Sequence, residues 1–472
     1  MRYLSVRDPY KAGGEVLYVA GNGGDMRHTK RISGVAGMAA AVALALTACT
    51  TSVTTVIRPA TSSTASPGAT TGAPASPSLS PSPKASPSPT GPVVTITPDS
   101  GGTGADPSAG ITVTTASGTL KNVTVTNAGD PVVGAYAAGR TSWHNIYALD
   151  VSTSYTVTAS ATSAAGTTTK SVKFRTLTPK STVTAEIFEG YQASYGVGMP
   201  IILTFSQPIT DKAAVEQSIQ LKTSKLVIGA WYWDGNETLD FRPRDYWPAN
   251  TTVTLAAHLN GVDGGGGRYG THTLTQTFGI GQSLIAVANT VTHKTQIYVG
   301  GQLTYTWPIS TGKTTTPTPN GTYLTVQKGN PVRMIGGTKG QPGYYNELVN
   351  WAVRFTYSGD YYHSAPWSVV NQGVSNVSHG CVNLAPADAE TYYNLAIPGD
   401  PITITGSAKA GDWDNGWTEW SLSWQQYLQG SATGMAVEAG PQGSTFVSPS
   451  ALSADAGTVP LGTSAPGNYL VG

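Results

Sequence analysis

Apolar and polar residues alternate in two consecutive stretches of the chain, 92–179 and 180–281. In the first, the segments VVTITP, GITVTTA and SYTVTASAT carry apolar side chains at every second position, with Thr or Ser between them. In the second, strands are expected near PIILTFSQPI, KLVIGAWYWDG, ETLDFRP and TTVTLAAHL. Period-two segments separated by Gly, Asn and Asp turns are typical of sheets with one buried face. The pattern therefore predicts two successive β-sandwiches.

Each predicted sandwich has a feature of its own. In the first, Leu149 followed by Tyr155 resembles the tyrosine-corner region of immunoglobulin-like domains. The expected core of the second consists of five aromatic residues, namely Phe205, Trp231, Trp233, Phe241 and Trp247. Neither stretch contains an acid/base pair or a metal-ligand spacing. The simplest interpretation is two immunoglobulin-like modules that act as a spacer or a docking surface.

A third β-rich region, 282–407, carries one clear helix signal among its strands. Pro386, Asp388 and Glu390 have the composition of a first helical turn, and the helix is expected to end near Leu395. Its positive N-terminal end is expected to lie close to Cys381 and to lower the pKa of that thiol. The fold class is therefore dominated by β structure, with little helix.

The segment after this region, 408–435, is rich in tryptophan. Its large apolar residues recur at three- and four-residue steps, as Trp417, Trp420, Trp424 and Leu428. This spacing predicts a C-terminal helix with an aromatic stripe, which we expect to pack on the third region. The alternative is a surface patch for a membrane or a glycan. Residues 436–472 return to Gly, Ser, Pro and Ala and are expected to be disordered.

The composition supports this picture and excludes several classes of protein. Charged residues make up 11% of the 472, and Gly and Pro number 56 and 31. This balance argues against a helical bundle, a coiled coil or an acidic disordered protein. The 27 basic residues nearly cancel the 26 acidic ones, so there is no positive field to attract nucleic acid.

Residues 1–49 have the pattern of an export signal. Met26, which we expect to be the true start, is followed by the basic residues Arg27, Lys30 and Arg31 and then by an apolar segment at 35–46. That segment has the length of a signal peptide and is too short to span a bilayer comfortably. The following residues, 50–91, are almost wholly Ser, Thr, Pro, Ala and Gly, which predicts an extended linker.

The apolar segment ends in Leu46-Thr47-Ala48-Cys49, which resembles a bacterial lipobox. In that family the cysteine thiol is acylated and becomes the mature N-terminus. The resemblance implies a lipid anchor at Cys49 on the outer face of the cytoplasmic membrane. The alternative is an ordinary signal peptide with an incidental cysteine.

The second of only two cysteines, Cys381, lies in Ser378-His379-Gly380-Cys381-Val382-Asn383. Two cysteines exclude a disulfide framework and a multi-cysteine metal site. A nucleophilic thiol needs a base and donors for an oxyanion, which His363, His379 and the backbone around Gly380 could supply. Two alternatives are a buried cysteine with core histidines and a zinc site made of His363, His379 and Cys381.

His363, fourteen intervening residues and then SHGCVN resemble the signature of the YkuD-type L,D-transpeptidases. The upstream TPNGTY at 318–323 matches a second element of that family, and the wider resemblance covers roughly 283–407. The order of lipobox, linker, two immunoglobulin-like modules, catalytic domain and Trp-rich tail resembles a subgroup from Gram-positive bacteria that makes 3→3 cross-links.

The resemblance implies a ping-pong acyl transfer on peptidoglycan stem peptides. Cys381 would attack the carbonyl of meso-diaminopimelate at position 3 of a donor tetrapeptide, and D-Ala would leave. An amine of the acceptor stem would then resolve the thioester, without any cofactor. Carbapenems would acylate Cys381 as mimics of the donor. The alternatives are a carboxypeptidase, in which water resolves the thioester, and a non-catalytic wall-binding lipoprotein.

The resemblance also implies a role for each site residue. His363 would be the base, oriented by the backbone carbonyl of Ser364, while His379 would line the site. The backbone N–H groups of 379–381, including that of Gly380, would bind the oxyanion. The residues that fall where the family places substrate contacts are Asn383, Trp367, Tyr345 and Met334; for Trp367 and Tyr345 the alternative is an ordinary core position. The Gly- and Pro-rich segment 328–345 is expected to be a lid, with a solvated loop as the alternative.

Overall fold

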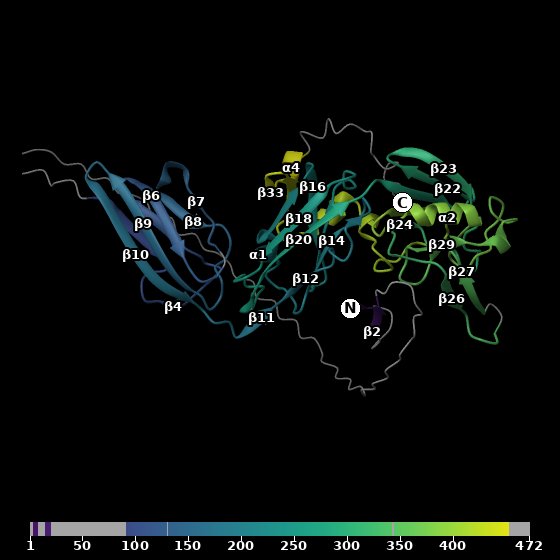
Figure 1. The fold of residues 1–472 in the computed structure, drawn as a ribbon, viewed down its shortest axis with the longest axis horizontal. Coiled ribbons are helices and arrows are strands. Elements are labelled where there is room, and N and C mark those ends of the chain that lie inside the picture. The colour runs from purple at the N-terminus through teal and green to yellow at the C-terminus, as the bar shows by residue number, and fades with distance from the viewer. Residues whose placement is uncertain (1–2, 8–14, 20–90, 130, 342–343, 453–472) are drawn as a thin grey trace, which may run out of the picture. The chain divides into compact units, whose positions relative to one another are not determined.

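The computed structural model describes residues 3–7, 15–19, 91–129, 131–341 and 344–452 (Figure 1). The chain divides into two compact units, 1–88 and 89–472. In the first unit, β1 (Tyr3–Arg7) pairs with the antiparallel β2 (Glu15–Val19), a pairing that the sequence did not lead us to expect. The predicted basic and apolar segments, the lipobox and residues 50–90 of the predicted linker lie outside the described residues.

The second unit begins with a β-sandwich. One sheet has the order β3 (Val93–Thr97), β5 (Thr112–Ala116), β8 (Ser142–Asn145) and β7 (Gly134–Tyr136), with the 3-10 turn η1 (Ala138–Arg140) before β8. The other has the order β4 (Thr103–Ala105), β10 (Gly166–Thr176), β9 (Ser154–Ser163) and β6 (Thr119–Thr126). Alternate residues of β9 are buried, as the period-two pattern requires. The backbone N–H of Asp150 donates to Tyr155 Oη at 2.8 Å, which closes the expected tyrosine corner.

A second sandwich follows. One sheet contains β12 (Ala185–Ile187), β14 (Ile201–Phe205), β17 (Thr238–Pro243) and β16 (Val227–Asp234). The facing sheet contains β13 (Ser194–Tyr195), β20 (Thr273–Ile280), β18 (Thr252–His258) and β15 (Ile219–Thr223). The pair β11 (Ser181–Val183) and β19 (Arg268–Gly270) and the helix α1 (Lys212–Gln217) complete it. All five aromatic residues predicted as its core are buried. The prediction of two sandwiches is therefore confirmed.

The C-terminal segment does not behave as expected. Residues 436–472 were predicted to be disordered, but β32 (Ala436–Gly440) pairs with β16, and β33 (Gly443–Val447) pairs with β32. Figure 1 shows the yellow β33 beside the teal strands of the second sandwich. Val437 and Ala439 enter the core of that sandwich, which explains why this small-residue segment is ordered. The strands also cover β16, which would otherwise be an exposed edge. The short helix α4 (Pro449–Leu452) follows.

The Trp-rich segment also departs from the prediction. Its helix is interrupted, because Leu422 is extended between the 3-10 turn η3 (Glu419–Ser421) and the helix α3 (Trp424–Leu428). Trp417 belongs to the core of the second sandwich, and Trp420 Nε1 donates to the carbonyl of Gly198 at 2.7 Å. A bond from Ser421 Oγ to the carbonyl of Thr322, at 3.3 Å, reaches the third region. Asn415 Nδ2 also donates to Ser358 Oγ of the third region at 3.0 Å. The segment therefore packs on the second sandwich as well as on the third region, and the expected packing is confirmed in part.

The third region is built on two sheets. The first has the order β23 (Gln302–Pro308), β22 (Lys294–Val299), β21 (Leu284–Asn289), β31 (Pro401–Thr405) and β24 (Gly321–Leu324). The second has the order β25 (Gln327–Gly329), β28 (Ala352–Arg354), β29 (Tyr361–Ser364) and β30 (Val382–Leu384). Helix α2 (Pro386–Leu395), where the sequence predicted it, contacts β29, and the 3-10 turn η2 (Pro366–Ser368) follows that strand. A separate hairpin consists of β26 (Val332–Gly336) and β27 (Tyr345–Val349).

None of the helices in the described part of the chain is long and apolar enough to cross a membrane.

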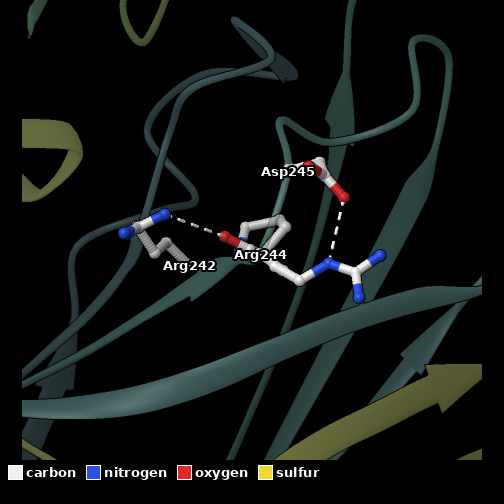
Figure 2. Close-up of polar contacts among 4 residues, drawn as sticks. Arg242, Arg244 and Asp245 are labelled. Carbon is white, nitrogen blue, oxygen red and sulfur yellow. Dashed lines mark hydrogen bonds and ion pairs between the residues drawn. The ribbon is translucent and has the colours of Figure 1, made fainter. Parts of the chain in front are cut away.

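Arg242 of β17 joins the C-terminal segment to the second sandwich. Its guanidinium stacks 4.4 Å from the ring centres of both Trp420 and Tyr427, and it donates to the carbonyl of Leu422 at 3.0 Å. The side chain is buried, which lowers its pKa. Figure 2 shows it near Arg244, whose side chain forms an ion pair with the exposed Asp245 at 3.2 Å.

We expect Arg242→Ala to lower the free energy of unfolding of the second sandwich by about 3 kcal/mol, because a buried cation with two aromatic partners is lost. Chemical denaturation followed by Trp fluorescence measures this. The matched control, Arg244→Ala, removes a surface ion pair and should cost no more than about 0.5 kcal/mol. If the two substitutions had equal effects, Arg242 would not be what holds the C-terminal segment on the second sandwich.

Candidate active site

Two parallel strands bring the predicted base and nucleophile together. β29 pairs with β30 so that His363 lies opposite Asn383, and Tyr362 opposite Val382. Tyr362 and Val382 belong to the hydrophobic core, and side chains alternate along a strand, so His363 and Asn383 point to the opposite face. Cys381 immediately precedes β30 and, by the same alternation, shares the face of Asn383. The register therefore places residues distant in sequence on one surface.

His363 is oriented by a backbone carbonyl. Its Nδ1 lies 2.9 Å from the carbonyl oxygen of Ser364, as the family resemblance implies. Because a carbonyl only accepts, Nδ1 carries the proton and Nε2 offers a lone pair. Burial lowers the pKa of His363 to about 4. At neutral pH the imidazole is therefore uncharged and able to accept a proton.

The thiol of Cys381 is half-buried and hydrogen-bonded as a donor. Its Sγ lies 3.9 Å from the carbonyl oxygen of Gly359. Burial, and secondly the charge of Asp360, raises the pKa of Cys381 to about 12, against hydrogen bonds from the backbone N–H groups of Tyr361 and of Cys381 itself. The net shift is therefore upward rather than the lowering that the sequence led us to expect, because burial dominates. The resting pair is thus a thiol and a neutral imidazole.

The turn before the nucleophile is held by two hydroxyl groups. Ser378 Oγ accepts the N–H of Gly380 at 3.1 Å and donates to the carbonyl of Cys381 at 2.6 Å. Thr318 Oγ1 donates to the carbonyl of Gly380 at 2.6 Å. The N–H of Gly380 is therefore already engaged, and the N–H groups of His379 and Cys381 are the remaining oxyanion donors from the predicted set.

Glycine is required at position 380. Its φ of +137° is a conformation that other residues rarely adopt, and a Cβ there would lie 2.2 Å from Asp360 Oδ1. The absence of a side chain at Gly380 is thus its main contribution, because it lets Asp360 pack directly against the turn.

His379 connects the signature to the β26–β27 hairpin. Its ring stacks on Tyr345 with 4.8 Å between ring centres, and its Nε2 lies 3.1 Å from Lys313 Nζ. Burial, and secondly the charge of Lys313, lowers the pKa of His379. Tyr345 also folds over Gly336, where a Cβ would come within 2.3 Å of its ring. The segment expected to be a lid thus includes β26 and touches the signature through Tyr345.

The remaining predicted substrate residues lie at different distances from the reacting pair. Trp367 is 56% exposed, and its ring centre lies 6.0 Å from that of His363. Asn383 is buried and donates to Ser368 Oγ at 3.0 Å. Met334 lies on the hairpin, opposite Glu347 in the register. The alternative that Trp367 is an ordinary core residue is therefore wrong.

Sequence reasoning missed three polar groups at this site. Lys313 and Asp360 lie in turns outside the signature, and the carbonyl of Gly359 accepts from the thiol. Nothing in their local sequence distinguishes these residues, since the tertiary fold alone brings them to Cys381 and His379. Within the described ranges, no group of three or more His, Cys, Asp or Glu residues is arranged to hold a metal ion.

A thiol and an oriented, neutral imidazole on one face of a strand pair have the composition of a cysteine-dependent acyl-transfer site. Comparison with known proteins agrees. Residues 283–404 match the model of the L,D-transpeptidase catalytic domain (YkuD), and residues 102–263 match that of a bacterial Ig domain.

Among curated proteins, the chain is 34% identical over 342 residues to L,D-transpeptidase 2 of Mycobacterium tuberculosis, which covers 70% of this chain and 84% of the relative. It is 33% identical over 358 residues to L,D-transpeptidase 5 of the same species, covering 73% and 78%. Among solved structures, the L,D-transpeptidase LdtMt1 in complex with imipenem is 35% identical, with a TM-score of 0.41, covering 48% of this chain and 100% of that one. The chain belongs to the YkuD family of L,D-transpeptidases and carries a bacterial Ig domain.

The two pKa values predict how the thiol reacts with an alkylating agent. Because the pKa of Cys381 is raised to about 12 and that of His363 is lowered to about 4, neither group titrates between pH 6 and pH 9. The rate of alkylation by iodoacetamide should therefore keep rising with pH through this range, as the thiolate fraction grows.

Intact mass measured against time checks this prediction, with Cys381→Ala as the control for labelling elsewhere. A plateau near neutral pH would instead indicate a preformed thiolate–imidazolium pair.

Proposed function

We propose that this L,D-transpeptidase forms 3→3 cross-links in peptidoglycan. The donor is a tetrapeptide stem, and the acylated residue is the meso-diaminopimelate at its third position. The observation that carries the proposal is the neutral imidazole of His363, fixed by Ser364 on the same face as Cys381. Membership of the family supplies the substrate class.

In the first half-reaction, Nε2 of His363 takes the thiol proton as Sγ attacks the donor carbonyl. A thiol whose pKa is about 12 requires such a base at neutral pH. The N–H groups of His379 and Cys381 stabilise the oxyanion. The imidazolium then gives its proton to the nitrogen of D-Ala, which leaves, and a thioester remains on Cys381.

In the second half-reaction, an amine of the acceptor stem attacks the thioester carbonyl. As the new bond forms, Nε2 of His363 takes a proton from the attacking nitrogen. The thiolate leaves and recovers this proton from the imidazolium, so the enzyme returns to its resting state. The free energy of the broken peptide bond is retained in the thioester, and no cofactor takes part.

The donor stem would lie under the β26–β27 hairpin, between Tyr345 and the exposed ring of Trp367. Lys313, the cation beside His379, would attract a stem carboxylate. Asn383 would support the floor of the site, and Met334 would contact the stem from the hairpin. Carbapenems would acylate Cys381 in the same place.

The function is tested by incubating the protein with a disaccharide-tetrapeptide and analysing products by mass spectrometry. We expect a 3→3 dimer and free D-Ala, neither of which Cys381→Ala should produce. His363→Ala should lower the acylation rate by about 100-fold or more, the usual contribution of a general base. Tripeptide without dimer would assign a carboxypeptidase, and the absence of any thioester would favour a wall-binding protein.

We further propose that a lipid anchor at Cys49 holds the enzyme on the outer face of the cytoplasmic membrane. The support is the lipobox and the basic and apolar segments before it. Two or three acyl chains give stable anchoring, because each buried methylene contributes about 0.8 kcal/mol.

Cys49→Ala should therefore move the protein from the membrane fraction to the medium, whereas Cys381→Ala should leave it with the membrane. Fractionation followed by immunoblotting measures both. Membrane retention of the Cys49 variant would rule the anchor out.

A further inference from the structure

Asp360 is a carboxylate beside the nucleophile that the first half-reaction does not use. It lies at the end of the turn before β29, and its Oδ1 abuts the Cα of Gly380, the neighbour of Cys381. Its Oδ2 accepts hydrogen bonds from Thr356 Oγ1 at 3.0 Å and from Ser358 Oγ at 3.5 Å. Within the part of the chain that the structure describes, Oδ1 receives no hydrogen bond.

The carboxylate disfavours the first half-reaction. Burial is the main cause of the raised pKa values of Cys381 and Tyr345, and the charge of Asp360 adds to both, so Asp360 acts electrostatically on the thiol and on the hairpin. A negative charge at this place opposes the thiolate and the oxyanion alike. A catalytic role for Asp360 must therefore lie in another step of the reaction, one that a negative charge favours.

The second half-reaction is such a step. At neutral pH the attacking amine of an acceptor stem is an ammonium ion, which has no lone pair and cannot attack a carbonyl. It must first lose a proton to a nearby base. The imidazole of His363 cannot do this and also protonate the leaving thiolate without a second proton acceptor.

We propose that Asp360 binds the ammonium group of the acceptor stem through Oδ1 and takes its proton. This inference rests on the proposed function and makes Asp360 a catalytic residue of the transfer step. Its partner is a primary ammonium carried by a peptide stem, held at the Gly380 side of the thioester.

The proton balance of the step is complete. The ammonium gives one proton to Oδ1 and becomes an amine, whose nitrogen forms the new bond to the thioester carbonyl. His363 takes the second proton from that nitrogen and passes it to the thiolate as the carbon–sulfur bond breaks. Asp360 then releases its proton to solvent, so one amide, one thiol and one proton are produced.

The charges of the site are consistent with these separate roles of Asp360 and His363. Lys313 lies beside His379, whereas Asp360 lies behind Gly380, so a cation and an anion flank the signature turn. Burial raises the pKa of Asp360 and makes it a stronger base, while Thr356, Lys409, Ser358 and Arg354 act in the opposite direction. Water carries no charge for Asp360 to bind, so the residue favours transfer over hydrolysis.

The test is the partition of the acyl-enzyme in Asp360→Asn, which keeps the size of the side chain and removes its charge. With the tetrapeptide as donor and acceptor, we expect the ratio of dimer to tripeptide to fall at least 10-fold relative to wild type. Acylation by imipenem should not be slower, because no ammonium takes part in it. Transfer to hydroxylamine, which is uncharged at neutral pH, should survive in the variant.

The matched control is Asp245→Asn, which removes one exposed negative charge from the second sandwich and should keep the wild-type ratio. An unchanged ratio in Asp360→Asn, or equal losses with hydroxylamine and with the stem acceptor, would overturn the inference and leave the proposed function intact. Absence of dimer in wild type would instead overturn the proposed function and, with it, this inference.

If Asp360→Asn fails to fold, as absence of imipenem acylation would reveal, wild type alone still tests the inference. In competition between the stem ammonium and hydroxylamine, the enzyme should favour the stem. A preference for hydroxylamine would contradict an ammonium site.

Discussion

The parallel pairing of β29 with β30 is the constraint on which the site depends. It is a register of three residues, and a slip by one would turn His363 into the hydrophobic core and Tyr362 out of it. The large buried rings of Tyr362 and Tyr392 therefore do more than stabilise the domain. By occupying one face of β29, they force the imidazole onto the other, the face that Cys381 shares by the same register.

Burial then sets the chemistry of that pair. Desolvation lowers the pKa of His363 and raises that of Cys381, so both groups are neutral until a substrate arrives. Such a resting state protects the thiol from indiscriminate alkylation and oxidation, because the thiolate is the reactive form. The Cys381 thiol then reacts only when an acyl donor is bound and His363 can take its proton. Its reactivity is thereby coupled to substrate recognition.

The sequence predicted what local patterns encode. Alternation along β9 and β17 indicated sandwiches, and the resemblance of His363 and the SHGCVN segment to the family signature implied a base and a nucleophile. Lys313 and Asp360 could not be found in this way, because only the folded turns bring them to His379 and Gly380. The raised pKa of Cys381 was missed for a similar reason, since burial is a property of the assembled domain. The strands β32 and β33 were missed because their residues are small and their partner, β16, is some two hundred positions away.

The return of the chain to β16 makes the second sandwich a discontinuous domain. Its first strands precede the catalytic domain and its last two follow it, so the catalytic domain is an insertion tethered at both ends. A chain that folds from its N-terminus must leave this sheet unfinished until β32 and β33 have emerged, and such long-range pairing is slow. Completion of the sheet thus requires that the catalytic domain has been made first, and a chain cut short before β32 would expose the open edge of β16.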